Sequence, residues 1–162
     1  LGHSAVPELS LSENILLSQF PNNNFTINGI INYQNIETHV NEVIEKFNVI
    51  TPGSDAKASS LSGGNLQKFV IGREILSNPR LLIISHPTWG IDAGAEFSIR
   101  ESLINLSKKG TSIIVISQDL DELFEITHRI SVIFNGSLSV SHKTKDVSVE
   151  NIGLLMGGHK ND

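Results

Sequence analysis

The sequence predicts an α/β fold in which a parallel sheet is preceded by a smaller helical lobe. Two short apolar runs, at 81–84 and 112–117, have the composition of strands that are buried on both faces. Helical patterns separate such runs, and strands that alternate with helices are typical of a parallel sheet. The pattern before residue 61 is mostly helical. We therefore place a helical subdomain over residues 1–78 and a sheet-containing core over residues 79–162.

Local signals place the helices of the first lobe. Ser10 and Glu13 form a capping box, which predicts a short helix that ends at the turn cluster 21–24. The polar stretch up to Asn35 is expected to be a loop or a short helical piece. Apolar residues then recur at helical spacing, which predicts an amphipathic helix over 36–48.

Helices and turns also bound the predicted strands of the core. A helix is expected over 65–77, and a second over 93–108 with Asp92 as its N-cap. Asn135-Gly136 is a hairpin-type turn. The remaining expected elements are a helix, a strand with its hairpin partner, and a final helix, at 119–127, 130–134, 137–141 and 149–156.

Composition and charge exclude several classes of function. Twelve basic and 17 acidic residues give a net charge of −5, so no nucleic-acid partner is expected. The chain has no cysteine, and its six histidines show no ligand spacing, so no metal site is expected. No apolar run approaches the roughly 20 residues that span a bilayer. The chain begins with Leu1 rather than Met, which favours a start inside a larger protein.

The segment at the start of the 65–77 helix has the composition of a phosphate site. Its residues are Leu61, Ser62, Gly63, Gly64 and Asn65. Glycines allow backbone N–H groups to approach an anion, the helix start adds partial positive charge, and Ser62 adds a hydroxyl. Local physics leaves an alternative open, in which Ser62 is a plain N-cap and the glycines only turn the chain.

Together with Gln67-Lys68, this LSGGN segment resembles the ABC signature motif, in the variant found in simple-sugar and nucleoside importers. The strand at 81–84 and the residues up to Asp92 resemble the Walker B strand and D-loop, and 112–118 resembles the strand before the switch position. The resemblance covers essentially the whole chain. It implies a partial P-loop NTPase (RecA-like) fold, with a three-layer parallel sheet and a small α-helical signature subdomain.

The chain also departs from this family at its catalytic positions. It contains no G-x-x-x-x-G-K-[ST] phosphate loop, so it looks N-terminally truncated relative to a whole nucleotide-binding domain. The Walker B Asp and Glu correspond to Ser85 and His86, and a neutral hydroxyl is a poor Mg²⁺ ligand. His86 is either a general base or a tolerated residue at a site without chemistry, and we expect the latter. The switch histidine corresponds to Gln118, which carries no charge.

The resemblance implies that LSGGN serves in trans, facing a nucleotide held by a second nucleotide-binding domain. Asp92 would be the D-loop aspartate that communicates across the dimer, as well as an N-cap. ATP and Mg²⁺ are implied for the full-length protein. These 162 residues alone are expected to bind no nucleotide tightly and to be inactive.

The implied partners are the second nucleotide-binding domain, permease subunits and, indirectly, a solute-binding protein. The implied location is peripheral, at the cytoplasmic side of the bacterial inner membrane. Without the family's central strand, we expect the isolated chain to close its sheet differently or to self-associate through an exposed sheet edge. Trp89, the only tryptophan, is expected to pack in the interior.

Two other functions compete with transport. A soluble ABC protein of DNA repair or translation is disfavoured by the negative charge, the short helical lobe and the LSGGN variant. A non-enzymatic interaction module is the second alternative, and it applies to the chain in isolation.

Overall fold

The computed structural model describes residues 4–19 and 25–159. The chain divides into two compact units, 1–114 and 115–162, and each is described by itself. The turn cluster expected at 21–24 lies outside the described residues. The subdomain boundary at 78/79 stays a prediction, since the division into compact units concerns a different point of the chain. In the described ranges, no helix combines the length and apolarity needed to cross a bilayer.

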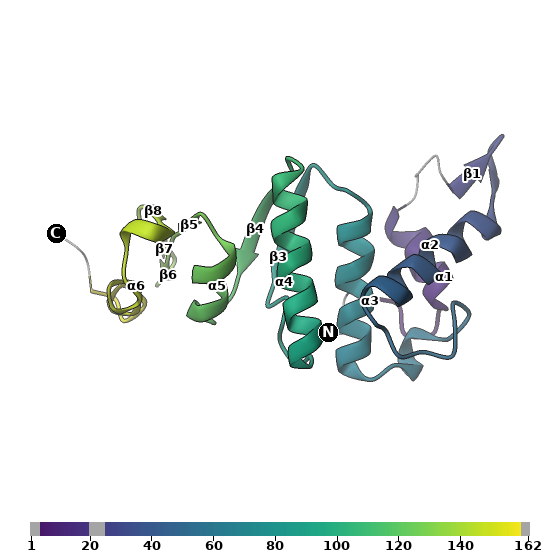
Figure 1. Ribbon diagram of the computed structural model, residues 1–162, viewed down its shortest axis with the longest axis horizontal. Helices are drawn as coiled ribbons and strands as arrows, with labels where there is room; N and C mark the ends of the chain where they lie inside the picture. Colours follow the sequence, from purple (N-terminus) through teal and green to yellow (C-terminus); the bar gives the residue numbers. More distant parts are fainter. Residues whose placement is uncertain (1–3, 20–24, 160–162) are drawn as a thin grey trace. The chain divides into compact units, whose positions relative to one another are not determined.

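Three helices build the lobe of the first unit: α1 (Leu11–Gln19), α2 (Tyr33–Lys46) and α3 (Gly63–Leu76). They pack against one another around buried aliphatic and aromatic side chains (Figure 1). The capping box is confirmed, because the Glu13 amide donates to Ser10 Oγ at 3.1 Å and the Ser10 amide donates to Glu13 Oε2 at 2.8 Å. A 3₁₀ turn, Ala58–Ser60, leads into α3.

The polar stretch before α2 is a hairpin instead of a loop or a helical piece. Strands β1 (Thr26–Ile27) and β2 (Ile30–Ile31) pair antiparallel. Asn28 and Gly29 between them have φ values of 51° and 79°, the left-handed conformation that a two-residue turn requires. Asn32 caps α2, which therefore begins three residues earlier than its apolar pattern indicates.

The unit continues with β3 (Leu81–Ser85), α4 (Ala93–Lys108) and the first three residues of β4 (Ser112–Ile116), whose last two residues fall in the second unit. The strands pair side by side. They start together, because the Ser112 amide donates to the Arg80 carbonyl at 3.1 Å, so they run in the same direction. Helix α4 connects them as a crossover and packs against α3.

The prediction that both strands are buried on both faces is wrong. Alternate side chains of β3 and β4 are exposed, including Leu81 (54%), Ile83 (60%) and Ile114 (50%), whereas Leu82 is buried. A continuous apolar run predicts burial on both faces only if further elements cover both faces of the sheet. Within the described residues of this unit, one face of the strand pair stays open.

The second unit holds α5 (Leu120–Ile126) and α6 (Val149–Met156), with four short strands between them. These are β5 (Arg129–Ile130), β6 (Ile133–Phe134), β7 (Ser137–Leu138) and β8 (His142–Lys143). A 3₁₀ turn, Thr144–Asp146, precedes α6. Leu123, Ile130, Val132 and Ile152 form the core of this unit.

The single strand expected at 130–134 is split in the structure. β5 pairs antiparallel with β8, and β6 pairs antiparallel with β7. Between β5 and β6 the Val132 amide donates to Ser139 Oγ at 2.9 Å, so a side chain accepts its hydrogen bond in place of a strand partner. The hairpin turn at Asn135-Gly136 is confirmed, with φ values of 45° and 74°.

Candidate functional site

The LSGGN segment lies at the N-terminus of α3, with Ser62 as the N-cap. The helix begins at Gly63, two residues before the predicted start, so both glycines belong to its first turn. Backbone N–H groups in a first helical turn have no partner within the helix, and they carry the positive end of the helix dipole. Ser62 and Gly63 are exposed. The segment therefore presents N–H groups and a hydroxyl to solvent.

Asn65 fixes the Ser62 hydroxyl, a role that spacing in the sequence did not indicate. Its backbone N–H and its side-chain Nδ2 both donate to Ser62 Oγ, at 3.4 and 3.0 Å. Its Oδ1 accepts a 2.9 Å bond from the Ile50 amide, which ties the helix start to the connector before it. Because the hydroxyl accepts two bonds from Asn65, its own hydrogen is available to donate outward.

The two glycines differ in their surroundings. A Cβ built on Gly63 meets nothing within 4 Å, so the space above its backbone is open. A Cβ built on Gly64 would lie 3.0 Å from the Gly90 carbonyl oxygen. Gly64 thus allows the loop after β3 to approach α3, whereas the backbone at Gly63 is open.

Two further residues of α3 hold this loop, which runs from His86 to Asp92. Gln67 Nε2 donates to the His86 carbonyl at 3.3 Å. Lys68 Nζ lies 2.7 Å from Asp92 Oδ2 and donates to the Asn48 carbonyl at 3.4 Å. Lys68 is only 5% exposed, so its ammonium is a buried charge whose counterion comes from the loop.

Asp92 caps α4 and also pairs with Lys68. Its Oδ1 accepts from the Ala95 amide at 2.9 Å, which confirms it as the N-cap of α4. The hydrogen bond from Lys68 and the one from Ala95 hold the pKa of this carboxyl below its ordinary value of 3.8. One ionised side chain, that of Asp92, thereby joins α3 to the start of α4.

The end of β3 carries Ser85 and His86, which the sequence resemblance aligned with the Walker B Asp and Glu. Ser85 is exposed, and His86 follows it with a left-handed φ of 48°. The His86 and Trp89 rings lie 6.0 Å apart at 57°. The expectation that Trp89 packs in the interior is wrong, since it is 79% exposed. Its short loop leaves the ring only the imidazole as an aromatic neighbour.

The residues at the end of β3 do not fit Mg²⁺. Ser85 and His86 offer a neutral hydroxyl and an imidazole, whereas this hard cation prefers carboxylate oxygens and water. Among residues 4–19 and 25–159, no three His, Asp or Glu side chains gather where they could hold a metal ion. The first unit brings LSGGN, His86 and Asp92 together, and Gln118 belongs to the second unit, where it is exposed.

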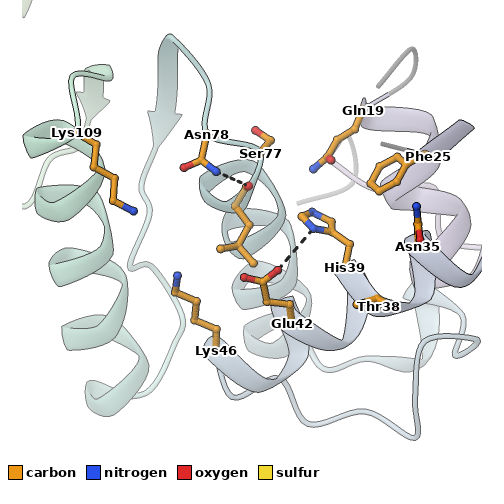
Figure 2. Close-up of a pocket in the computed structure, with 11 residues that line it drawn as sticks. Gln19, Phe25, Asn35, Thr38, His39, Glu42, Lys46, Ser77, Asn78 and Lys109 are labelled. Atoms are coloured by element: carbon orange, nitrogen blue, oxygen red, sulfur yellow. Dashed lines mark hydrogen bonds and ion pairs between the residues drawn. The ribbon is translucent and has the colours of Figure 1, made fainter. Parts of the chain in front are cut away.

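A separate cavity of about 480 Å³ lies among the helices of the lobe, away from LSGGN (Figure 2). Its walls come from α1, α2 and the ends of α3 and α4. Figure 2 shows His39 and Glu42 of α2 beside it, with a 3.9 Å separation between His39 Nδ1 and Glu42 Oε2. No residue of the LSGGN segment lines this cavity.

The fold is that of an ABC ATPase cassette. A dimeric structure of MJ0796, a bacterial ABC transporter cassette, matches with a TM-score of 0.73 at 20% identity, over 89% of this chain and 61% of that one. No family model matches the chain.

The sequence relatives of the chain are ATP-binding proteins of sugar and nucleoside import. The nucleoside import ATP-binding protein NupA of Lactococcus lactis subsp. cremoris is 39% identical over 158 residues, 97% of this chain and 31% of that protein. The galactose/methyl galactoside import ATP-binding protein MglA of Escherichia coli (strain K12) is 38% identical over 93% of this chain and 30% of that protein. The chain thus spans about a third of the length of the curated relatives it matches.

Proposed function

We propose that the protein containing this chain is the ATPase subunit of an importer for a sugar, a nucleoside or a similar solute. In this proposal the LSGGN segment completes a nucleotide site that a second ATP-binding domain holds. The supporting observation is the open N-terminus of α3, where Ser62 and Gly63 are exposed and no atom of residues 4–19 or 25–159 fills the space above Gly63.

The chemistry of this helix start suits a phosphate group. The first-turn N–H groups donate to phosphate oxygens, and the helix dipole favours their negative charge. The Ser62 hydroxyl, oriented by Asn65, donates its remaining hydrogen in the same direction. None of these donors requires net positive charge on the chain, which agrees with a net charge of −5. When bound, ATP supplies the terminal phosphate that these donors recognise.

The positions that would serve the domain's own nucleotide site are altered in this chain. Ser85 and His86 replace the acidic pair, and Gln118 replaces the switch histidine. We propose that this site binds ATP weakly or without turnover in the full-length protein. The 162 residues alone lack a phosphate loop, so a titration with ATP should show neither tight binding nor hydrolysis.

The proposed partners follow from the role of such a subunit. They are the second ATP-binding domain, permease subunits and, through the permease, a solute-binding protein. The proposed location is the cytoplasmic face of the bacterial inner membrane, with the chain attached peripherally. Coprecipitation of a permease with the full-length protein would support this assembly over a soluble ABC protein or a non-enzymatic interaction module.

Turnover of the full-length protein tests the proposal. Ser62→Ala should lower kcat by about 100-fold, the usual cost of removing one donor to charge that develops in a transition state. His86→Ala should cost far less. Ser59→Ala, a change at another exposed serine just upstream, is the matched control and should leave turnover unchanged. Loss of activity from the His86 change alone would refute the proposal.

A further inference from the structure

We infer that Trp89 is the aromatic anchor with which the face that carries LSGGN binds the second ATP-binding domain. The inference rests on the proposed function, because that function puts the second domain against this face. It also assigns a use to His86 that involves no catalysis, namely support of the Trp89 ring.

The exposure of Trp89 is the first observation. This single tryptophan of the chain is 79% exposed. A tryptophan buries about 150–250 Å² when it is covered, more than other side chains, so leaving it in water forgoes a large favourable contribution. The tilted contact with His86, at 6.0 Å between ring centroids, covers only a small part of the indole.

The loop around Trp89 is fixed at both of its ends. Gln67 donates to the His86 carbonyl at one end, and Lys68 pairs with Asp92 at the other. Within the loop, the Trp89 amide donates to the His86 carbonyl at 3.3 Å, and Gly90 has a left-handed φ of 76°. A ring held on such a loop loses little conformational freedom on binding. A larger part of the free energy gained by burying the ring therefore contributes to affinity.

The position of the loop indicates what covers the ring. Its Gly90 carbonyl lies 3.0 Å from the Cβ position of Gly64, so the loop directly adjoins the first turn of α3. A domain that brings a phosphate to Ser62 and Gly63 therefore also reaches the loop that bears Trp89. The solved cassettes that share this fold include dimers. Buried tryptophans that fill a pocket in the partner are over-represented among the residues that dominate interface energies.

Fluorescence of the full-length protein tests the inference without relying on turnover. The emission of the unaltered protein minus that of Trp89→Phe isolates the signal of Trp89, whatever other tryptophans the protein contains. A non-hydrolysable ATP analogue should shift this difference spectrum to the blue and should reduce its quenching by acrylamide.

Affinity gives a second measurement. An anchor that contributes about 2 kcal/mol to association of the two domains also strengthens binding of the analogue between them, by about 30-fold. Trp89→Ala should therefore weaken apparent binding of the analogue by about 30-fold, and Trp89→Phe by less. Tyr33→Ala, which removes another exposed aromatic ring, from α2, should leave binding unchanged. Because Trp89 is exposed, its replacement leaves no cavity, and circular dichroism melting should confirm an intact fold.

Each combination of results has a distinct meaning. A difference spectrum and quenching that do not respond to the analogue overturn the inference about Trp89. If Ser62→Ala abolishes turnover in that same protein, the proposed function stands without it. If Trp89 becomes buried while Ser62→Ala leaves turnover intact, the ring binds the second domain and the signature proposal fails.

Discussion

The two adjacent glycines of LSGGN differ in what they are needed for: we expect Gly64 to be needed for folding and Gly63 for contact with a phosphate. Alanine at either position adds one methyl group to the first turn of α3. At Gly63 this group enters open space, and at Gly64 it lies 3.0 Å from the Gly90 carbonyl oxygen. We expect Gly64→Ala to displace the loop after β3, and Gly63→Ala to leave the folded chain unchanged.

The magnitudes follow from two opposing effects. Replacing glycine by alanine in a helix stabilises it by up to about 1 kcal/mol, and this gain applies to both variants. Forcing a methyl group against a backbone oxygen costs about 1–3 kcal/mol, and this cost applies at Gly64 alone. Gly64→Ala should therefore be less stable than Gly63→Ala by about 1–3 kcal/mol. For a chain of this length, that corresponds to a melting temperature about 5 °C lower.

Thermal and urea unfolding of the two variants, followed by circular dichroism, measures this difference. Turnover of the full-length protein supplies the functional half of the comparison. Gly63→Ala should lower turnover despite its neutral or favourable effect on stability, because its methyl group stands where we propose that a phosphate approaches. Equal melting of the two variants would refute the close approach of the loop to Gly64. Full turnover by Gly63→Ala would refute the phosphate contact.

Three further outcomes are expected. Asn65→Ala removes the bond to the Ile50 amide and should lower stability by about 1 kcal/mol in urea unfolding. Lys68→Met should raise the Asp92 pKa toward its ordinary 3.8, as measured by NMR titration. In the unaltered chain, the stability that the Asp92 carboxylate contributes is present above pH 3.8 and is lost as the pH falls through the lowered pKa. Burial lowers the pKa of His39 below 6.5, against a smaller opposing effect of the Glu42 carboxylate. The free energy of unfolding should therefore fall as the pH drops from 6.5 through the lowered pKa. His39→Gln should remove this decline in unfolding experiments between about pH 5 and 8.

Elements with local end signals were predicted well from the sequence. The helices at 93–108 and 149–156 match α4 and α6 residue for residue. Their N-caps, Asp92 and Ser148, each accept a bond from the third residue of the helix, and that contact needs no tertiary partner. The hairpin at Asn135-Gly136 was likewise predicted from two residues whose backbone preference is local.

Features that depend on tertiary surroundings were not predictable in the same way. Asn28-Gly29 is an exception, because it is the same local turn signal as Asn135-Gly136 and lies in a stretch that was expected to be a loop or a short helical piece. The exposed side of β3 depends on which elements cover the sheet, and the sequence of the strand does not contain that information. The strand expected at 130–134 is interrupted at Val132, because its amide donates to the Oγ of Ser139, seven residues further along the chain.

In the candidate site, too, local features were predictable from the sequence and tertiary contacts were not. Local physics made LSGGN a candidate phosphate site but left a plain N-cap open, and the resemblance to the signature motif favoured the phosphate site. The contacts that hold the loop were missed, because Gln67 and Lys68 bond to groups 19 to 24 residues further along the chain. A lysine inside a largely apolar helix segment was the available signal, since a buried ammonium requires a counterion.

These contacts give the loop after β3 a structural role that does not depend on catalysis by Ser85 or His86. Ser85 and His86 give the end of β3 a neutral hydroxyl and an imidazole, which suit a hard cation poorly. Its bonds to α3 nevertheless fix Asp92 at the start of α4 and hold the loop that bears the exposed Trp89 against Gly64. If LSGGN completes a nucleotide site of a second domain, as we propose, changes at the end of β3 should be tolerated there. Changes that break the contacts from α3 should instead disturb the face that carries LSGGN.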